Sequence, residues 1–323
     1  MSATPRNKRM EGPLADWFAR RTFHTDDFDI ADLRRRKEEA GTTVSVVLPS
    51  FNEADTVAGV IQAVRELEGT LIDEIVLIDG GSGDDTADIA AAAGARVHQD
   101  ADVLPDLGPT LGKGDALWRS LTVTTGDIVV FVDTDIRNPD PRFVWGLLGP
   151  LLVEPQVQLV KAFYERPVQM GDVLHATGGG RVTELMARPL LNLFWPELAG
   201  LVQPLSGEYA GRRELLESIP FFTGYGVEIG MLVDTLAGSG IDAIAQVDVS
   251  ERVHRNQAMD ALSRMAYGIV QVAIARLADE GRLPRELAEA SERYVQFVRD
   301  ERGRIQPAER EVPIIERPPL RQA

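Results

Sequence analysis

The sequence lacks cysteine altogether among its 323 residues. A disulfide framework and a thiolate metal site are therefore both excluded. Long apolar runs are also missing: no uninterrupted stretch approaches the roughly 20 residues that a membrane-spanning helix needs. The N-terminus, MSATPRNKRMEGPLADWF, has no apolar signal core. We therefore expect no membrane partner and a cytoplasmic location.

Positive charge is scarce. The 34 lysines and arginines stand against 50 aspartates and glutamates, which gives a formal net charge of −16. Such a balance repels polyanions and argues against nucleic acid as a partner. Any anionic ligand must therefore be held by a local cluster of cations. The length is sufficient for one large α/β domain or two smaller ones with a sizeable core.

Strand, loop and helix patterns alternate from Thr43 onward. The stretch TVSVVLPSFNEADTVAGVIQAVRELEG predicts a buried strand, a polar turn and an amphipathic helix. The unit repeats in DEIVLIDGGSGDDTADIAAAAGA, whose helix should end at Gly94, and a short strand follows around residues 96–98. This order is typical of an α/β fold with a doubly wound, mostly parallel sheet. The charged segment before it predicts a solvated helix and a surface arm.

The stretch GDIVVFVDTDIRNP combines a buried strand with two carboxylates. Its apolar run, residues 128–132, predicts a strand covered on both faces. Asp133, Thr134 and Asp135 follow at the carboxyl edge, where open α/β sheets bind ligands. Two carboxylates in Asp-x-Asp spacing can hold Mg²⁺ or Mn²⁺, which bridge to substrate phosphates. An ordinary Asp-rich turn is the competing interpretation.

Other polar residues fall at the same predicted edge. Asn52 and Glu53 follow the first strand, although helix capping alone would explain them. Asp79 and Gly80 follow the second strand, where the glycines could also serve only a tight turn. Lys113 lies between two glycines at a predicted helix start, as a phosphate clamp would. Its spacing is not that of a Walker A motif, and a solvated lysine is the alternative.

Two features of the second half point to ligands. Three glycines precede Arg181 at the start of an amphipathic helix, which makes Gly180, Arg181 and Thr183 candidates for binding a small phosphate or carboxylate. The alternative there is a flexible loop whose arginine meets a surface acid. Glu228 is a lone acid on a largely apolar helix that begins at Gly226 and is costly to desolvate without a partner. Sugar hydroxyls would satisfy it, and N-terminal capping is the competing account.

The C-terminal region predicts helices and an extended tail. Residues 258–280 are predicted to form a long amphipathic helix, a candidate dimer face, and residues 282–300 another helix. The proline-rich end should pack as an extended arm.

Ser206 and Gly207 are expected in a polar turn before a helix. His254 alone would more often be a hydrogen-bonded structural residue than a metal ligand.

Several of these blocks resemble a known family. VVLPSFNEADTV, IDGGSGDDT, GKGDALW and VVFVDTDIRNP look like the nucleotide-sugar half of a GT-A glycosyltransferase. QLVKAFYERP, ATGGGRVTELMARPLL, GYGVEIGMLVDT and SERVHRN resemble the glucosyl-3-phosphoglycerate synthases and the related mannosyl-3-phosphoglycerate synthases. The resemblance covers residues 40–270 and the last dozen. It implies a GT-A fold with an acceptor-binding C-terminal part.

The resemblance also implies roles for individual residues. Asp135 and His254 would hold Mg²⁺ or Mn²⁺, and Asp135, Glu228 and Lys113 would be the catalytic residues. The expected donor-binding residues are Pro49, Ser50, Phe51, Asn52, Glu53, Asp79, Gly80, Lys113, Asp133, Thr134, Tyr225, Glu228 and Arg252. The expected acceptor-binding residues are Gly180, Arg181, Val182, Thr183 and Asn256.

The function that follows is transfer of glucose from UDP-glucose to the 2-hydroxyl of D-3-phosphoglycerate, with retention at the anomeric carbon. No convincing protein nucleophile stands out for a double displacement, so front-face attack assisted by the leaving phosphate is our working hypothesis. Transfer of mannose from GDP-mannose is the nearest alternative. A polyprenyl-phosphate glycosyltransferase and a nucleotide-sugar-binding protein without turnover are more distant. The product could serve as a compatible solute or as a primer of methylglucose lipopolysaccharide.

The expected organisation has four parts. Residues 1–40 form the N-terminal arm and residues 41–160 the nucleotide-sugar-binding half. Residues 161–257 form the acceptor- and metal-binding half, and residues 258–323 supply helices, the tail and contacts of an expected homodimer.

Overall fold

The structure is a computed structural model that describes residues 11–165, 168–170, 173–175, 180–253, 258–287 and 292–322. Two predicted site residues, His254 and Asn256, lie outside the described residues. Within the described part, no helix is long and apolar enough to cross a bilayer.

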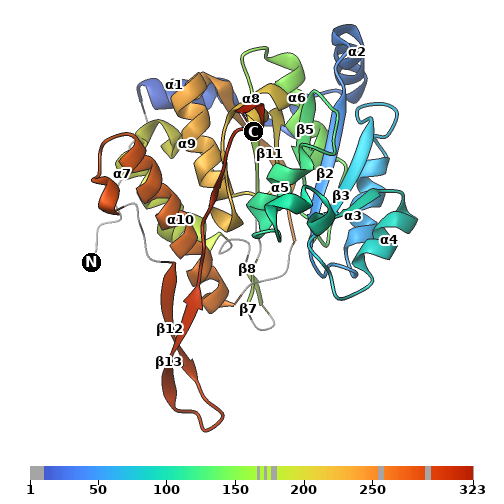
Figure 1. The fold of residues 1–323 in the computed structure, drawn as a ribbon. Helices are drawn as coiled ribbons and strands as arrows, with labels where there is room; N and C mark the ends of the chain where they lie inside the picture. Colours follow the sequence, from blue (N-terminus) through green and yellow to red (C-terminus); the bar gives the residue numbers. More distant parts are fainter. Residues whose placement is uncertain are drawn as a thin grey trace.

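A single large sheet organises the molecule (Figure 1). Its eight strands run in the order β1-β11-β6-β9-β5-β2-β3-β4, and β9 alone is antiparallel to its neighbours. Their bounds are β1 Thr22–His24, β2 Val44–Ser50, β3 Glu74–Asp79, β4 Arg96–Gln99, β5 Ile128–Phe131, β6 Leu159–Glu165, β9 Tyr209–Arg212 and β11 Ile244–Glu251. The prediction of a doubly wound, mostly parallel sheet is confirmed.

Helices cover both faces of this sheet. One face packs on α2 Ile30–Ala40, α3 Val57–Arg65, α4 Thr86–Ala93 and α6 Arg142–Val153. The other face packs on α1 Pro13–Arg21, α5 Lys113–Ser120, α7 Arg188–Phe194, α8 Arg213–Ser218, α9 Val227–Ser239 and α10 Met259–Asp279. Residues 128–132, covered on both sides, are buried throughout, as their unbroken apolar run predicts.

The N-terminal region is not the surface arm that its charge predicts. From Pro13 onward the chain is built into the fold: β1 extends the sheet by pairing in parallel with β11. Trp17 is only 1% exposed and donates from its indole nitrogen to the carbonyl of Ile241 at 3.0 Å. The expected solvated helix does form, as α2.

The C-terminal region also departs from expectation. The helix predicted over residues 282–300 is wrong, because β12 Arg293–Arg299 and β13 Ile305–Glu311 form an antiparallel hairpin that projects from the body (Figure 1). The expected extended tail is confirmed: β14 Glu316–Arg317 pairs with β10 Phe221–Phe222. The apolar stripe of α10 is core rather than free surface from Ile269 onward.

Short elements complete the description: β7 Val168–Met170, β8 Val173–His175, and single helical turns at η1 Thr25–Asp27, η2 Asp100–Asp102, η3 Pro105–Leu107, η5 Pro196–Gly200, η6 Gly224–Gly226, η7 Ile241–Ala243, η8 Arg285–Leu287 and η9 Leu320–Gln322.

Candidate active site

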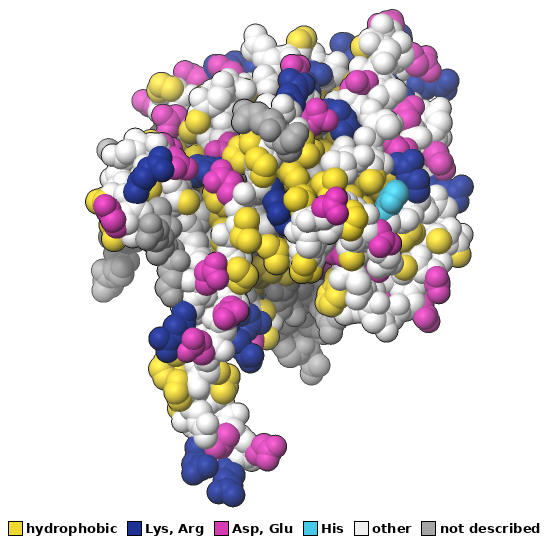
Figure 2. Space-filling view, in the orientation of Figure 1, with side chains coloured by type: hydrophobic (Ala, Val, Ile, Leu, Met, Phe, Trp, Pro, Cys, Tyr) yellow, Lys and Arg dark blue, Asp and Glu magenta, His cyan; other side chains and the backbone are white. Residues whose placement is uncertain are grey.

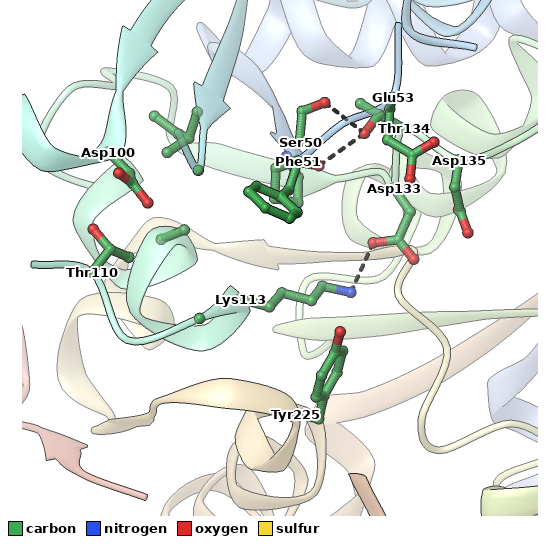
Figure 3. A pocket seen from close by; sticks show the side chains of 15 residues that line it. Ser50, Phe51, Glu53, Asp100, Thr110, Lys113, Asp133, Thr134, Asp135 and Tyr225 are labelled. Atoms are coloured by element: carbon green, nitrogen blue, oxygen red, sulfur yellow. Dashed lines mark hydrogen bonds and ion pairs between the residues drawn. The ribbon is translucent and has the colours of Figure 1, made fainter. Parts of the chain in front are cut away.

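A cavity of about 540 Å³ opens at the carboxyl ends of β2, β3 and β5 (Figure 3). Its walls carry most of the predicted donor-binding residues. The lining residues are Pro49, Ser50, Phe51, Glu53, Ile78, Gly80, Asp100, Thr110, Gly112, Lys113, Ala116, Asp133, Thr134, Asp135 and Tyr225. The structure therefore brings together the ends of three strands and the start of α5, as the topology of a parallel sheet requires.

Asn52 and Asp79 form the frame of this cavity rather than its wall. Asn52 has a positive φ of 56° and donates from its backbone N–H to the Ser82 hydroxyl at 2.8 Å. Its side-chain oxygen accepts from the N–H of Gly83 at 2.8 Å. The Asp79 carboxylate is buried and accepts from the Ser82 hydroxyl and backbone N–H. These two predicted donor ligands hold the loops after β2 and β3 together.

The threonine of the Asp-x-Asp motif fixes the two carboxylates. Thr134 is buried, and its hydroxyl is 3.1 Å from the carbonyl oxygen of Pro49 and 3.0 Å from the Ser50 hydroxyl. These bonds tie the segment after β5 to the end of β2. Asp133 and Asp135, on either side, then face the cavity (Figure 3).

A buried ion network occupies one end of the cavity. The Lys113 amine is 2.7 Å from Asp133 and 3.2 Å from Glu228, at the first turn of α9. The Arg252 guanidinium is 3.3 Å from Asp133 and also pairs with Asp135. Burial alone would raise the pKa of Asp133, but the Lys113 and Arg252 charges outweigh it and hold that pKa well below the usual range. Burial likewise would lower the pKa of Lys113, and Asp133 and Glu228 instead raise it, so this amine stays protonated.

Arg252 is clamped from behind by residues that sequence reasoning missed. Its guanidinium is 2.8 Å from the fully buried Glu208 and donates to the Tyr164 hydroxyl at 2.7 Å. The Tyr164 hydroxyl in turn donates to Glu208 at 2.6 Å. Desolvation raises the pKa of Glu208 despite the nearby Arg252 charge. The signal available in the sequence was weak, because Glu208 stands in a turn with no motif of its own.

Gly207 has a steric role that the sequence did not predict. The turn at Ser206 and Gly207 leads into β9 rather than directly into a helix. A Cβ at Gly207 would lie only 2.0 Å from a carboxylate oxygen of Asp133. Glycine is therefore required here so that Asp133 can occupy its position.

A second buried cation, Lys161, lies near this network. It is 2% exposed, sits 4.3 Å from the centre of the Tyr209 ring and donates to the carbonyl of Ser206. Burial lowers the pKa of Lys161 to about 7. A lysine inside the apolar run QLVKAFY was the sequence signal that could have found it.

The predicted acceptor residues lie at the start of another helical segment. Helical structure begins at Arg181, after Gly180 with φ 76°, and the Glu184 N–H donates to the Gly180 carbonyl at 2.9 Å. The first regular turns are a π-helix, Thr183–Ala187, followed by α7. The expected helix start is thus confirmed. Residues 176–179 are not described, so binding of an acceptor by Gly180, Arg181, Val182 and Thr183 stays a prediction.

The carboxylates at the cavity fit a hard divalent cation. Asp135 lines the cavity, and its carboxylate forms an ion pair with the Arg252 guanidinium. Among the described residues there is no cluster of three or more His, Asp or Glu side chains that could hold a metal. Mg²⁺ is commonly bound through one or two carboxylates together with substrate phosphates and water, and Asp135 can supply such a carboxylate. The predicted contribution of His254 lies outside the described residues.

Comparisons with known proteins agree with this geometry. Residues 45–168 match the glycosyl transferase family 2 model. The glucosyl-3-phosphoglycerate synthase of Petrotoga mobilis is 44% identical over 95% of this chain and 95% of its own. That of Mycobacterium tuberculosis is 52% identical over 79% of both chains. This chain belongs to the glucosyl-3-phosphoglycerate synthase family.

Solved structures extend the family likeness to the whole fold. A crystal structure of the Mycobacterium tuberculosis glucosyl-3-phosphoglycerate synthase with Mn²⁺, UDP and glucosyl-3-phosphoglycerate has a TM-score of 0.82 at 44% identity and covers 94% of this chain and 99% of its own. The mannosyl-3-phosphoglycerate synthase of Rubrobacter xylanophilus has a TM-score of 0.87 at 45% identity, over 96% and 97%. The resemblance stated from the sequence and the GT-A fold are confirmed.

Proposed function

We propose that this protein transfers glucose from UDP-glucose to the 2-hydroxyl of D-3-phosphoglycerate, with Mg²⁺ or Mn²⁺ as cofactor. The observation that carries the proposal is the cavity in which Asp133, Asp135 and Lys113 face one another at the carboxyl edge of the sheet. A structure of the Mycobacterium tuberculosis relative contains Mn²⁺, UDP-glucose and phosphoglyceric acid together. Membership of the same family supports the same three ligands for this chain.

In this proposal Asp135 and His254 would hold a divalent cation, which would supply positive charge to the leaving diphosphate. Lys113 faces the same end of the cavity and remains a cation, so it adds a second positive charge there. Glu228 sits at the first turn of α9, paired with Lys113 at 3.2 Å, in position to accept from sugar hydroxyls.

The ion pairs also bear on the route of substitution. Asp133 and Glu228, two carboxylates next to the cavity, are each engaged by Lys113, and Asp133 also by Arg252. A carboxylate paired with a cation is a weaker nucleophile, because its negative charge is already stabilised. This favours front-face attack, in which the acceptor hydroxyl replaces the diphosphate on the same face and its proton passes to a leaving phosphate oxygen. The proposed outcome is retention of configuration.

Mannose transfer from GDP-mannose is the second candidate. Its support is specific: the Rubrobacter xylanophilus mannosyl-3-phosphoglycerate synthase matches this chain over 96% of its length. A polyprenyl-phosphate glycosyltransferase has less support. The undecaprenyl-phosphate 4-deoxy-4-formamido-L-arabinose transferase of Sodalis glossinidius, 33% identical, covers only 31% of this chain.

The test is release of nucleoside diphosphate by the purified protein with Mg²⁺ or Mn²⁺. UDP-glucose and GDP-mannose are compared with and without D-3-phosphoglycerate, and Asp135→Ala serves as the matched variant. We expect release that requires the acceptor and metal, is faster with UDP-glucose and falls by at least about 100-fold in Asp135→Ala. Acceptor-independent release from both donors would remove the acceptor from the proposal, and a faster GDP-mannose reaction would replace the donor.

We also propose a homodimer that uses the β12–β13 hairpin. A two-stranded hairpin alone is only marginally stable in water. This one exposes Val295, Phe297 and Ile305, and Figure 2 shows hydrophobic side chains along the projection with charged ones at its tip. A second copy that covers these side chains would supply the missing core. Light scattering after size exclusion should give a dimer that Phe297→Ser weakens, whereas a monomeric wild type would overturn the proposal.

We further propose that the enzyme works in the cytoplasm. Both proposed substrates are multiply charged and cannot cross a bilayer unaided. The enzyme must therefore share a compartment with them. Fractionation of cells should recover the protein and its acceptor-dependent activity together in the cytoplasmic fraction.

A further inference from the structure

Two polar side chains lie at the end of the cavity opposite the ion network. Asp100 and Thr110 face each other there, while Asp133 and Asp135 lie at the other end, beyond Phe51 and Lys113 (Figure 3). Asp100 follows directly after β4, in a short helical turn, Asp100–Asp102. Neither residue takes part in the sites assigned above.

The charges fix which end of a nucleotide can reach Asp100. This step rests on the proposed function, a nucleoside diphosphate sugar bound in the cavity. The diphosphate is drawn to the Lys113 end, where a metal can join it. At the opposite end the carboxylate of Asp100 repels phosphate. The nucleobase therefore lies between Phe51, a residue that is 60% exposed, and the Asp100–Thr110 pair.

Asp100 has few other partners to satisfy it. Burial raises the pKa of its carboxyl against the opposing effects of the Thr110 hydroxyl, the Ala101 backbone N–H and the Arg119 charge. The Thr110 hydroxyl oxygen is buried and makes no well-formed hydrogen bond within the part of the chain that the structure describes. Both groups thus retain capacity for hydrogen bonds with a ligand. A ligand that shields them from water without forming those bonds loses binding free energy, because the polar groups are desolvated and left unpaired.

The wall that carries them is held from behind. Arg119 is fully buried and donates to the carbonyl oxygens of Val103, Leu104 and Gly108, at 3.1 Å for Leu104 and 2.9 Å for Gly108. The loop between Asp100 and Thr110 is therefore fixed before any ligand enters. A fixed pair of polar groups can discriminate, because it cannot move to suit a mismatched partner.

The chemistry of the pair sets which bases fit. An ionised carboxylate only accepts hydrogen bonds, whereas a hydroxyl can donate one. Uracil presents a ring N–H between two carbonyl oxygens, and guanine a ring N–H beside one carbonyl and an amino group. Cytosine and adenine present a ring nitrogen lone pair at the same place, which would face the carboxylate oxygen. We propose that Asp100 and Thr110 read this edge of the donor base, admitting uracil and guanine and rejecting cytosine and adenine.

The test measures binding, without turnover. Titration calorimetry at pH 8 with Mn²⁺ compares UDP, GDP, CDP and ADP on wild type, Asp100→Asn and Thr110→Val, with Asp106→Asn, an exposed acid of the same loop, as control. We expect UDP or GDP to bind at least about tenfold more tightly than CDP and ADP. In Asp100→Asn, whose amide can also donate, the preference over CDP should fall to within about threefold. Thr110→Val should weaken UDP binding by about fivefold, and Asp106→Asn should match wild type.

Two outcomes would overturn the inference. One is a wild type that binds CDP or ADP as tightly as UDP and GDP. The other is an Asp100→Asn variant that keeps the wild-type order of the four nucleotides. Failure of the proposed function is separate: the predicted base preference without any hexosyl transfer to 3-phosphoglycerate would uphold this role of Asp100 while removing the acceptor.

Discussion

The two ends of the cavity are built in opposite ways. At the diphosphate end, charged side chains interlock in a buried network, each paired with at least one other. At the base end, one carboxylate and one hydroxyl from a single loop line the cavity, without an ion pair to the network among the described residues. The network residues come from distant parts of the chain: Lys113, Asp133, Asp135, Glu208, Glu228 and Arg252.

The difference separates catalysis from selection. A network assembled from several strands and helices positions charge for any nucleoside diphosphate donor, because the diphosphate is common to all of them. The Asp100–Thr110 loop contributes no residue to that network, and in the proposed arrangement it faces the base, in which donors differ. Substitutions at the diphosphate end should therefore slow turnover with all donors alike. Substitutions at the base end should change only the order in which the enzyme prefers the donors.

The largest expected effect comes from Gly207→Ala, which attacks the diphosphate end directly. The added Cβ would lie 2.0 Å from an Asp133 oxygen, so the carboxylate must move away from Lys113 and Arg252. A displacement of about 1 Å in such a site can reduce kcat by about 100-fold. We expect at least that loss with UDP-glucose and GDP-mannose alike, measured as initial rates.

Gly238→Ala is the matched control, because a Cβ there meets nothing within 4 Å. It should retain the wild-type rate. A Gly207→Ala enzyme that is as active as this control would show that the position of Asp133 is not needed. A loss confined to one donor would break the distinction between the two ends.

The second prediction concerns the wall that both ends share. Asp115, fully buried in the first turn of α5, accepts from the Leu111 N–H at 2.9 Å and from Arg317 of the tail at 2.8 and 2.9 Å. Arg317→Gln removes a partly buried cation, whose side chain is 13% exposed, from this buried carboxylate. Loss of one partner of a buried pair costs about 3–5 kcal/mol. Here we expect about 2 kcal/mol, because Arg119 remains 3.5 Å from Asp115.

Urea denaturation measures this loss, and Arg321→Gln is the control. Arg321 pairs with Glu214 on the surface, with side chains 48% and 81% exposed, so its removal should cost less than about 0.5 kcal/mol. Base preference and turnover should both decline in Arg317→Gln, since Thr110 and Lys113 flank the Leu111 contact. Equal stabilities of the two variants would mean that the tail does not support the wall.

The sequence located most residues of the diphosphate end but not Asp100 and Thr110 at the opposite end of the cavity. Asp133, Asp135 and Lys113 stand at strand and helix ends that hydrophobic patterning locates, and patterning is reliable for a sheet buried on both faces. Glu228 was marked as a lone acid on an apolar helix, whereas the role of Arg252 depended on the family resemblance. Asp79 stands at the carboxyl end of β3, and Asp100 follows the carboxyl end of β4 in the same way. Because β4 is short and partly exposed, its hydrophobic pattern is too weak to locate that end from the sequence.

Other errors have physical causes as well. The segment RYVQFVR is rich in β-branched and aromatic residues, which favours the observed β12 over a helix. The first 40 residues are rich in charge, and that masked the anchoring effect of the single buried Trp17. Gly207 and Glu208 could not be assigned, because nothing local indicates that β9 inserts antiparallel beside β5 and brings them against Asp133 and Arg252.

The smallest expected effect concerns Lys161, which borders the diphosphate end without joining its ion pairs. Burial lowers its pKa to about 7, whereas the unfolded chain has the ordinary value of 10.5. Between these two pH values the unfolded state binds more protons, so this residue makes the free energy of unfolding rise with pH, by at most about 1.4 kcal/mol per unit. Below pH 7 its contribution should level off. Lys161→Met should remove that rise, so the stability of the variant relative to wild type should decline between pH 7 and pH 9 in urea denaturation. Parallel curves for the two proteins would show that Lys161 stays protonated when folded, and the amine would then count as another fixed charge of the diphosphate end.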